Sequence, residues 1–202
     1  MTARLRVPPT RSVLLWLRRR RQALLSAADL LERKCRVLAQ KAYELLPRWQ
    51  QLHQQGYTQL ETAYRSFTVT RMRSTAGELR QIVAGMPALI SLQLRRQPLS
   101  GVPTFQVTTE RVPLRPRFGL LGSTAELDRT IGLLRDAVHA LAALAAVQAT
   151  LRALARALLK TNRQVRILRD HLIPIYENTI HYIEDTLDEQ ERDYLFQLRR
   201  LR

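Results

Sequence analysis

Leucine recurs at every seventh position over much of the first quarter of the chain, and this repeat constrains the fold more than any other feature. A second series, three residues before each leucine, is apolar at five of its six positions. Two apolar positions per heptad form the seam of a coiled coil. The repeat therefore predicts a long helix, capped by Thr10, that packs against another helix. The leucines are Leu17, Leu24, Leu31, Leu38, Leu45 and Leu52, and the second series is Leu14, Arg21, Ala28, Cys35, Ala42 and Trp49.

Several side chains along this helix are expected to modify it. Asp29, Glu32 and Glu44 each stand four residues before an arginine, which is the spacing of a stabilising pair on one helix. Pro47 is expected to bend the helix locally, because proline lacks an N–H and its ring crowds the preceding turn. Gly56 is expected to be a weak point near the end of the helix.

A second apolar repeat in the last third of the chain predicts another long helix. Ser123 and Glu126 have the spacing of a capping box at its start. The repeat shifts register between Leu141 and Leu144, and Pro174 is expected to kink the helix or open one hydrogen bond. The seam positions are Leu151, Leu158, Val165 and Leu172, with the companions Val147, Leu154, Thr161, Leu168 and Ile175. Apolar spacing resumes after the proline at Ile180, Ile183, Leu187, Tyr194, Leu198 and Leu201.

The stretch 67–121 differs from both repeats and predicts a short helix followed by a β-hairpin. Thr75 and Glu78 have capping-box spacing before a helix that ends near residue 85. Proline at position 103 limits how much sheet can form. The expected strands are 88–94 and 104–109, joined by a turn at 98–101.

Together these elements predict a mainly α protein built on a long antiparallel two-helix coiled coil. The antiparallel arrangement is the simplest way for one chain to pair two terminal seams, and about 50 residues of helix extend for roughly 75 Å. Such an elongated single domain has too little core per residue for an ordinary enzyme scaffold. Its parts are residues 10–66 (N-terminal coiled-coil helix), 67–121 (short helix and β-hairpin) and 122–202 (C-terminal coiled-coil helix).

The chain is strongly basic, with a net charge of +16 and 33 basic residues among its 202. The excess lies in the first two thirds, because residues 123–202 carry 12 basic and 11 acidic residues. A basic balance of this size favours anionic partners. The run Arg18–Arg21 is compatible with nucleic acid, anionic lipid or an acidic protein surface, and the residues alone leave these alternatives open.

No residue pattern indicates catalysis, a cofactor or a metal. The four histidines lack metal-ligand spacing, and no glycine-rich loop carries the lysine of a phosphate-binding loop. Cys35 falls on the apolar seam, which favours a small buried residue over a nucleophile. The uncharged helical stretch 137–151 is judged too short and too polar to cross a bilayer. The N-terminus lacks a signal-peptide pattern, so the cytosol is the default compartment.

Several stretches resemble the central-stalk D subunit of the V/A-type rotary ATPases, and the resemblance covers nearly the whole chain. It is most specific where Ile173-Pro-Ile-Tyr-Glu-Asn-Thr-Ile-His-Tyr-Ile is followed by Leu187-Asp-Glu-Gln-Glu-Arg-Asp-Tyr-Leu-Phe-Gln-Leu-Arg-Arg. Similar to the same family are Pro9-Thr10-Arg11 with Leu30-Leu31-Glu-Arg-Lys34, Ser100-Gly-Val-Pro-Thr-Phe, and Phe118-Gly-Leu-Leu-Gly-Ser-Thr-Ala-Glu-Leu-Asp.

The resemblance implies a non-catalytic central rotor shaft. In that family the two terminal helices form a coiled coil inside the bore of a hexamer of A and B subunits, which bind and turn over ATP. The F subunit binds alongside, and a funnel-shaped subunit joins the shaft to the membrane rotor ring. The resemblance thus implies a cytoplasmic protein that meets the membrane only through its complex, and that uses neither a cofactor nor specific nucleic acid.

The same resemblance implies which residues touch the bore. Arginines near both ends of the chain are expected to face its polar or acidic loops. Residues just after Pro174 are expected to act as cam contacts or, alternatively, only to soften the seam. The candidates are Arg18, Arg19, Arg20, Glu177, Asn178, Thr179, Arg199, Arg200 and Arg202. Two other functions stay open, namely a basic coiled-coil protein that binds nucleic acid and a tether or adaptor at anionic membranes.

Overall fold

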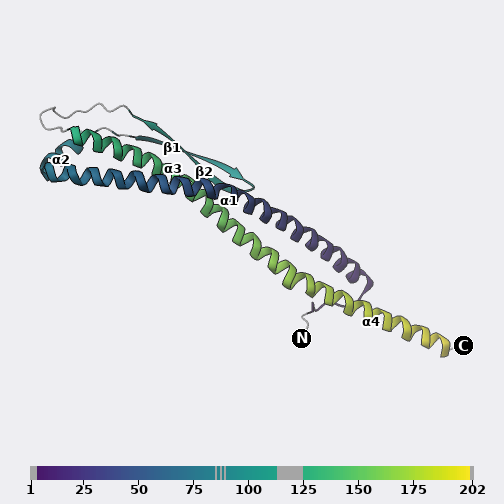
Figure 1. The fold of residues 1–202 in the computed structure, drawn as a ribbon. Helices are drawn as coiled ribbons and strands as arrows, with labels where there is room; N and C mark the ends of the chain where they lie inside the picture. The colour runs from purple at the N-terminus through teal and green to yellow at the C-terminus, as the bar shows by residue number, and fades with distance from the viewer. Residues whose placement is uncertain (1–3, 85, 87, 89, 113–124, 201–202) are drawn as a thin grey trace. The chain divides into compact units, whose positions relative to one another are not determined.

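The computed structural model describes residues 4–84, 86, 88, 90–112 and 125–200, which form helices and one two-stranded sheet (Figure 1). A long N-terminal helix packs against a long C-terminal helical run, with a short helix and an antiparallel hairpin between them in the chain. This confirms the predicted fold class. The elements are α1 (Arg11–Arg73), α2 (Ala76–Ala84), β1 (Ile90–Leu99), β2 (Val102–Arg111), α3 (Ala125–Arg166), the π-helix η1 (Ile167–Leu172) and α4 (Ile173–Arg200).

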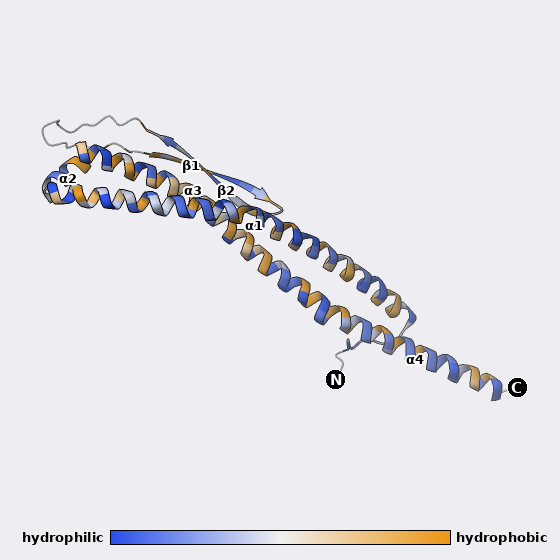
Figure 2. Cartoon of the chain, in the orientation of Figure 1, coloured by the Kyte–Doolittle hydropathy of each residue, from blue (hydrophilic) through white to orange (hydrophobic). Residues whose placement is uncertain are grey.

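The chain divides into two compact units, and each has its own packing. The terminal unit comprises Met1–Leu38 and Ala157–Arg202, and so contains the first part of α1 together with η1 and α4. The hairpin unit comprises Ala39–Arg156, and contains the rest of α1, α2, both strands and most of α3. Along the long helices, hydrophobic residues recur between hydrophilic ones (Figure 2).

Helix α1 begins at the predicted cap and continues through the predicted bend position. The Thr10 hydroxyl accepts a hydrogen bond from the Val13 N–H at 3.4 Å, and the Thr10 carbonyl accepts one from the Leu14 N–H at 3.0 Å. These bonds satisfy backbone donors that the first turn leaves without a partner in the helix. Pro47 lies inside the helix, which is unbroken around it.

In the last part of α1, the buried positions of the repeat are small residues rather than leucines. The series that ends in Trp49 continues at the same seven-residue interval with Gly56, Ala63 and Thr70, all of which are buried. The helix therefore runs to Arg73, beyond the end expected from the leucine repeat. Gly56 is a packing position inside a continuous helix, so the expectation that it lies near the end of the helix is wrong.

The core of the terminal unit joins α1 to α4. Leu17, Ile180 and Ile183 form a buried cluster. Leu38 is also fully buried, whereas Leu24 and Leu31 are half-buried in the same leucine series. The leucine series thus lies on the inward side of α1. Packed against the cluster are Leu5, Val7, Val13, Leu14, Tyr176 and Leu187.

The hydrogen-bond pattern of the C-terminal helix changes just before Pro174. Residues Ile167–Leu172 form a π-helix, and the Ile173 N–H donates to the carbonyl of Leu168, five residues back. A proline cannot donate to the carbonyl four residues back, and its ring crowds that carbonyl. The wider π-helical turn accommodates this conflict, and the helix continues as α4 to Arg200.

Helix α2 packs on α3 and is capped as predicted. Ile82 is buried with apolar residues from the start of α3. The Thr75 N–H donates to Glu78 Oε2 at 3.0 Å, and the Glu78 N–H donates to Thr75 Oγ1 at 3.5 Å, which confirms this capping box. The other expected capping box includes Ser123, which lies outside the described residues.

The hairpin is longer than the sequence predicted. A two-residue turn, Ser100-Gly101, joins strands of ten residues each, and both turn residues have positive φ, at 50° and 80°. Pro98 and Pro103 face each other one pair beyond the turn. In an antiparallel ladder this second pair exchanges no hydrogen bonds, so the two prolines remove no hydrogen bond between the strands. The limit expected from Pro103 is therefore wrong.

Strand β2 lies against α3 in the hairpin unit (Figure 1). The Phe105 N–H donates to the Thr150 hydroxyl at 2.9 Å, which fixes the middle of the strand to the helix. Thr150 is buried and also donates to the Ala146 carbonyl within α3 at 2.9 Å. One side of the α1–α3 pair is therefore covered by the hairpin.

The C-terminal helical run is more apolar than the sequence analysis allowed. Within Ala125–Arg200, an 18-residue window has a mean hydropathy of 1.5 and passes the length and composition test for a membrane-crossing helix. From the sequence, the uncharged stretch 137–151 is judged too short and too polar, whereas this longer window within the C-terminal helical run passes the test by length and composition alone. Of the window, 33% is buried inside the protein.

Gly56→Ala is expected to stabilise the protein. A Cβ at this position would lie 3.6 Å from Leu141 Cδ2 and 3.9 Å from Leu144 Cδ2, which is ordinary van der Waals contact. Alanine also favours the helix and restricts the unfolded chain, a gain of about 1 kcal/mol in the free energy of unfolding. Urea unfolding of the full chain measures it. Gly132→Ala is the control, because nothing lies within 4 Å of that site, and a smaller gain at 56 than at 132 would contradict the packing.

Candidate functional site

The described part of the chain presents charged and exposed apolar side chains on the surfaces of both units. In it, no group of three or more His, Cys, Asp or Glu side chains could hold a metal ion. Cys35 is a half-buried free thiol on α1.

Arginines of α1 face glutamates of α4 in the terminal unit. Arg11 pairs with Glu191, and Arg18, seven residues further on, pairs with Glu184, seven residues back. The Arg18 guanidinium donates twice to Glu184 Oε1, from Nη2 at 2.7 Å and from Nε at 3.2 Å. Opposite charges at heptad spacing beside a seam select the direction and register in which two helices pair.

Arg169 links η1 to α1 through two carboxylates. Its Nη2 lies 2.9 Å from Asp29 Oδ1 and its Nε 2.5 Å from Glu32 Oε1. The hydrogen bond to Glu32 and the charge of that carboxylate raise the pKa of Arg169. Glu44 receives a hydrogen bond from Lys41 at 2.7 Å, which lowers the pKa of the carboxyl. The predicted pairing of these three acids with arginines four residues later is thus wrong, because each finds another cation.

The residues expected to touch a partner differ in their exposure and in whether they already pair within the chain. Arg18 pairs with Glu184, and Glu177 lies 3.9 Å from Arg21, so both already have partners within the chain. Thr179 is 1% exposed, which leaves its side chain no surface to offer and supports the alternative that it serves the seam. Asn178 is half-buried, Arg19, Arg20, Arg199 and Arg200 are exposed, and Arg202 lies outside the described residues.

The segment before α1 folds onto α4, an arrangement that the sequence analysis missed. The Leu5 N–H donates to Thr179 Oγ1 at 3.0 Å, and the Thr179 hydroxyl donates to the Ile175 carbonyl at 2.7 Å. The Arg4 guanidinium lies 4.8 Å from the centre of the Tyr182 ring, a cation–π contact. The available signal was the alternation of Leu5 and Val7 with polar residues before the proline pair. We call residues 4–10 the N-terminal strap.

The last turns of α4 expose apolar side chains. Glu191 pairs with Arg11, the first residue of α1, and every described residue from 188 onward is exposed. The apolar spacing beyond Leu187 therefore forms no seam with α1. With Arg11 and Leu187, part of this end lines a groove of about 430 Å³. The exposed residues are Tyr194 (63%), Leu195 (57%), Phe196 (64%) and Leu198 (45%).

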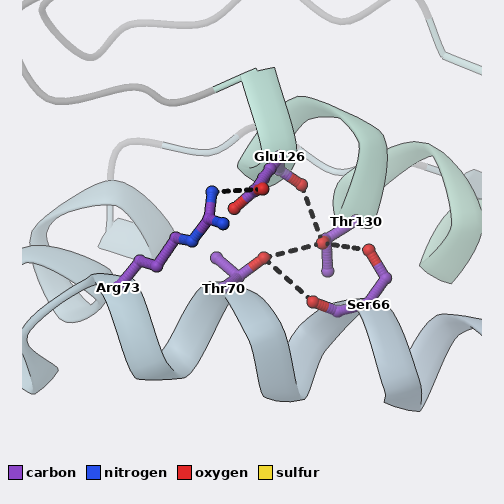
Figure 3. A network of polar contacts seen from close by, with 5 residues as sticks. All are labelled: Ser66, Thr70, Arg73, Glu126 and Thr130. Carbon is purple, nitrogen blue, oxygen red and sulfur yellow. Dashed lines mark hydrogen bonds and ion pairs between the residues drawn. The ribbon is translucent and has the colours of Figure 1, made fainter.

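A buried polar network joins α1 to α3 in the hairpin unit (Figure 3). Thr70 and Thr130 are each 1% exposed with hydroxyls 2.8 Å apart, and the Ser66 hydroxyl lies 2.7 Å from that of Thr130. The Thr130 hydroxyl donates to the Glu126 carbonyl at 2.8 Å, so it can accept from Ser66 and from Thr70, and the Thr70 hydroxyl can alternatively donate to the Ser66 carbonyl at 3.1 Å. Arg73 pairs with Glu126 beside them. A slip of one helix would break the hydroxyl contacts between α1 and α3 and leave each threonine only the carbonyl four residues back in its own helix, so the network favours this register.

Comparison with known proteins connects these surfaces to a family. The sequence model of the ATP synthase D-subunit family matches residues 13–202. The chain belongs to this family. The D subunit of the V-type ATP synthase of Thermotoga neapolitana is 29% identical over 196 residues, which cover 97% of each chain. The D subunits of the A-type ATP synthases of Methanopyrus kandleri and Pyrococcus horikoshii are 30% and 27% identical, over 97% and 98% of this chain and 85% and 94% of theirs.

This match confirms the family that the sequence motifs indicated. The matched residues include the motif from Ile173 to Ile183 and the Arg18–Glu184 pair beside the terminal seam. The match covers the whole hairpin unit and the terminal unit from residue 13 onward. A member of the ATP synthase D-subunit family is a component of a larger assembly. The exposed surfaces of both units are therefore candidates for contact with other subunits.

Reversing one charge of the Arg18–Glu184 pair is expected to destabilise this family member slightly. Arg18→Glu and Glu184→Arg each bring like charges together, whereas the double variant restores an attractive pair. Their side chains are 53% and 30% exposed, so the coupling free energy in a double-mutant cycle is expected to stay below about 1 kcal/mol and to shrink with salt. Thermal unfolding at low and high salt measures it. A double variant less stable than both single variants would refute the pairing.

Thr130→Val is expected to destabilise the protein by about 1–3 kcal/mol, because it removes the partner that the Ser66 and Thr70 hydroxyls share on α3. The double variant Thr70→Val/Thr130→Val removes both members and is expected to recover part of that loss. Urea unfolding measures the free energies. Thr62→Val on exposed α1 surface is the control and is expected to change stability by less than about 0.5 kcal/mol. Equal losses at 62 and 130 would show that the network contributes nothing.

Proposed function

We propose that the chain is the central rotor shaft of a V/A-type ATP synthase and transmits torque between a catalytic A/B hexamer and the membrane ion-translocating ring. In this role it catalyses no reaction itself. Membership of the D-subunit family supports the proposal. The observation that carries it is the exposed apolar end of α4, on a helix pair whose own seam is already filled.

The exposed end of α4 suits insertion into a sleeve formed by other subunits. Tyr194, Leu195 and Phe196 are each more than half exposed, and burying apolar surface yields about 25 cal/mol per Å². Their consecutive positions point them around the helix rather than along one face, because successive residues of a helix are about 100° apart. A ring of protein around the helix end would bury all three.

Exposed arginines suit contacts that must break and form again as a shaft turns. Arg19 and Arg20 on α1, and Arg199 and Arg200 on α4, are exposed. An exposed ion pair contributes only up to about 1 kcal/mol, so breaking one costs little. A wide dry apolar interface along the whole shaft would instead hold it at one angle.

The two helices of the terminal unit carry opposite charge, which makes the shaft surface asymmetric. From Arg11 to Leu38, α1 has eight basic and two acidic residues, whereas α4 has seven acidic and three basic. Three equivalent catalytic sites around the shaft therefore face different surfaces at any one angle. A surface that binds one conformation of a site better shifts that site toward it, and by linkage the state of the sites favours one shaft angle.

The partners in this proposal are the A and B subunits of the hexamer, the F subunit beside the shaft, and a funnel-shaped subunit at the membrane ring. The protein is then cytoplasmic and peripheral to the membrane through its complex. The glutamates that pair with Arg11, Arg18 and Arg21 would hold the helix pair together within the bore, where solvent is limited.

Changing Tyr194, Leu195 and Phe196 together to glutamine is expected to lower ATP-driven ion uptake several-fold in membrane vesicles that contain the assembled complex. Glutamine keeps the helix propensity of the segment, and the native side chains are exposed, so the fold of the chain is expected to persist. Ion uptake and ATP hydrolysis measured together report coupling. Gln190→Ala with Gln197→Ala is the matched control on the same turns. Unchanged uptake in the triple variant would refute the role of this end.

Purification of the tagged chain from its own cells tests the proposal more broadly. Recovery with the A and B subunits and nucleotide-dependent ATPase activity is the expected result. Recovery of nucleic acid or anionic lipid with no other component of an ATP synthase would refute the shaft and favour one of the two alternatives that the basic composition leaves open.

A further inference from the structure

The outer edge of strand β1 is a surface to which the proposed function assigns no role. Every residue from Ser91 to Pro98 is exposed, whereas β2 includes buried and half-buried residues and carries the hydrogen bond to α3. In the part of the chain that the structure describes, the sheet has two strands, so β1 has a partner on one side alone. An edge strand of this kind presents a row of backbone donors and acceptors to solvent.

The register of the hairpin identifies which backbone groups of β1 point away from β2. Leu99 and Val102 flank the two-residue turn and form a hydrogen-bonded pair, and such pairs alternate with non-bonded pairs along an antiparallel ladder. Phe105 and Arg96 form a non-bonded pair, and the Phe105 N–H donates outward to Thr150, as this alternation requires. On β1, the residues whose N–H and C=O groups point outward are Ile90, Leu92, Leu94 and Arg96.

A proline limits this row at the turn and leaves a stretch of seven residues. Pro98 has the same alternating position as Leu94 and Arg96, but it has no N–H to offer. The stretch therefore extends from Ile90 to Arg96, which is about 23 Å of extended strand. Its pairing with β2 is continuous, so no bulge bends it away from a third strand. We call the outward backbone groups of residues 90–96 the open edge.

Apolar and basic side chains follow one another along the open edge. Leu92 and Leu94 are 57% and 65% exposed, and they share a face because alternate residues of a strand do so. Arg96 continues that face, with its guanidinium 5.4 Å from the centre of the Phe105 ring, and Arg95 lies on the opposite face. Among the described residues neither arginine has an ion-pair partner, so both charges are available to an occupant.

We propose that the open edge binds an extended segment of another polypeptide, which adds a third, antiparallel strand to the hairpin. Main-chain hydrogen bonds supply the affinity in this mode of recognition, and alternate side chains supply the specificity. Antiparallel pairing places the residues of the segment opposite Arg96, Arg95, Leu94 and Leu92 in that order. Because opposite charges and apolar pairs across strands are favourable, the segment reads acidic–acidic–apolar–any–apolar from its N-terminus. This inference stands apart from the proposed rotor function.

The charge of the hairpin argues against a second copy of this chain as the occupant. Two β1 strands paired edge to edge would bring two arginines from each copy into one sheet, and each chain has a net charge of +16. Basic side chains on an edge strand are one means by which proteins prevent such self-pairing. The same two arginines attract an acidic segment, so they select the partner as well as exclude the copy.

A designed peptide tests the open edge on the full chain. The peptide Glu-Glu-Val-Thr-Val-Thr-Val, acetylated and amidated at its ends, has the predicted pattern, and fluorescence anisotropy of a labelled copy measures its binding. Saturable binding is expected, and Lys-Lys-Val-Thr-Val-Thr-Val is expected to bind about tenfold more weakly or worse, because two attractive pairs become repulsive. Hydrogen exchange at residues 90–96 is expected to slow in the complex. Equal affinity of the two peptides, or no saturable binding, would overturn the proposal.

Two N-methylated peptides separate strand pairing from general attraction to a basic protein. Methyl groups on the nitrogens of the third and fifth residues, opposite Leu94 and Leu92, remove the N–H groups that face β1 and are expected to abolish binding. Methyl groups on the fourth and sixth residues face away from β1 and are expected to leave binding unchanged. Similar binding of both methylated peptides would show charge attraction alone and would contradict a third strand.

Leu94→Pro makes the corresponding change in the chain. It removes an outward N–H but no hydrogen bond to β2, as Pro98 does, so the melting temperature is expected to stay unchanged while peptide binding is lost. Arg95→Glu/Arg96→Glu leaves the backbone intact and is expected to bind the lysine peptide in place of the glutamate peptide. Unchanged peptide preference in this variant would refute the predicted register. A chain that dimerises in sedimentation, with Leu94→Pro monomeric, would assign the edge to a second copy and overturn the proposal.

Discussion

The close approach of α1 to the C-terminal helices at small side chains is the constraint on which the rest of the structure depends. Ala28, Gly56 and Ala63 are buried in one heptad series of α1, where larger residues would hold the helices apart. Leucines of the other series and of α3 fill the remaining space. Because the helix backbones are close, flanking side chains reach across the pair, which permits the ion pairs of Arg18 in one unit and the hydroxyl bonds of Thr130 in the other.

The sequence predicted the elements whose signal is local or strictly periodic. The leucine repeat, the Thr10 cap and the Thr75–Glu78 box each follow from spacing alone, and the structure contains them. It failed where a residue's role depends on a distant partner. Gly56 reads as a helix breaker until Leu141 is known to lie beside it, and Glu32 reads as an intrahelical partner until Arg169 is brought to it from residues far along the chain.

The same reason explains which candidate contacts could be found from the sequence. Arg19 and Arg20 are available as predicted, because a run of arginines cannot all face a seam. Thr179 was given two possible roles, and its burial favours the one in the seam; the sequence around it carries no signal that the Leu5 N–H will donate to its hydroxyl. The net charge of +16 is likewise divided unevenly once the fold is known. Glutamates of α4 pair with arginines of α1, so part of the uncompensated charge lies on exposed arginines of α1 such as Arg19 and Arg20.

Any helix pair leaves two grooves beside its seam, and the two units use them differently. In the terminal unit, the N-terminal strap reaches Thr179 and Tyr182, each one residue before a buried isoleucine, whereas Glu184, one residue after Ile183, faces the arginines. In the hairpin unit, β2 fills the groove before the seam. The groove after the seam there holds tyrosines where the terminal unit has ion pairs. Charges that pair within the chain need no further partner, but exposed aromatic rings gain free energy only when something covers them.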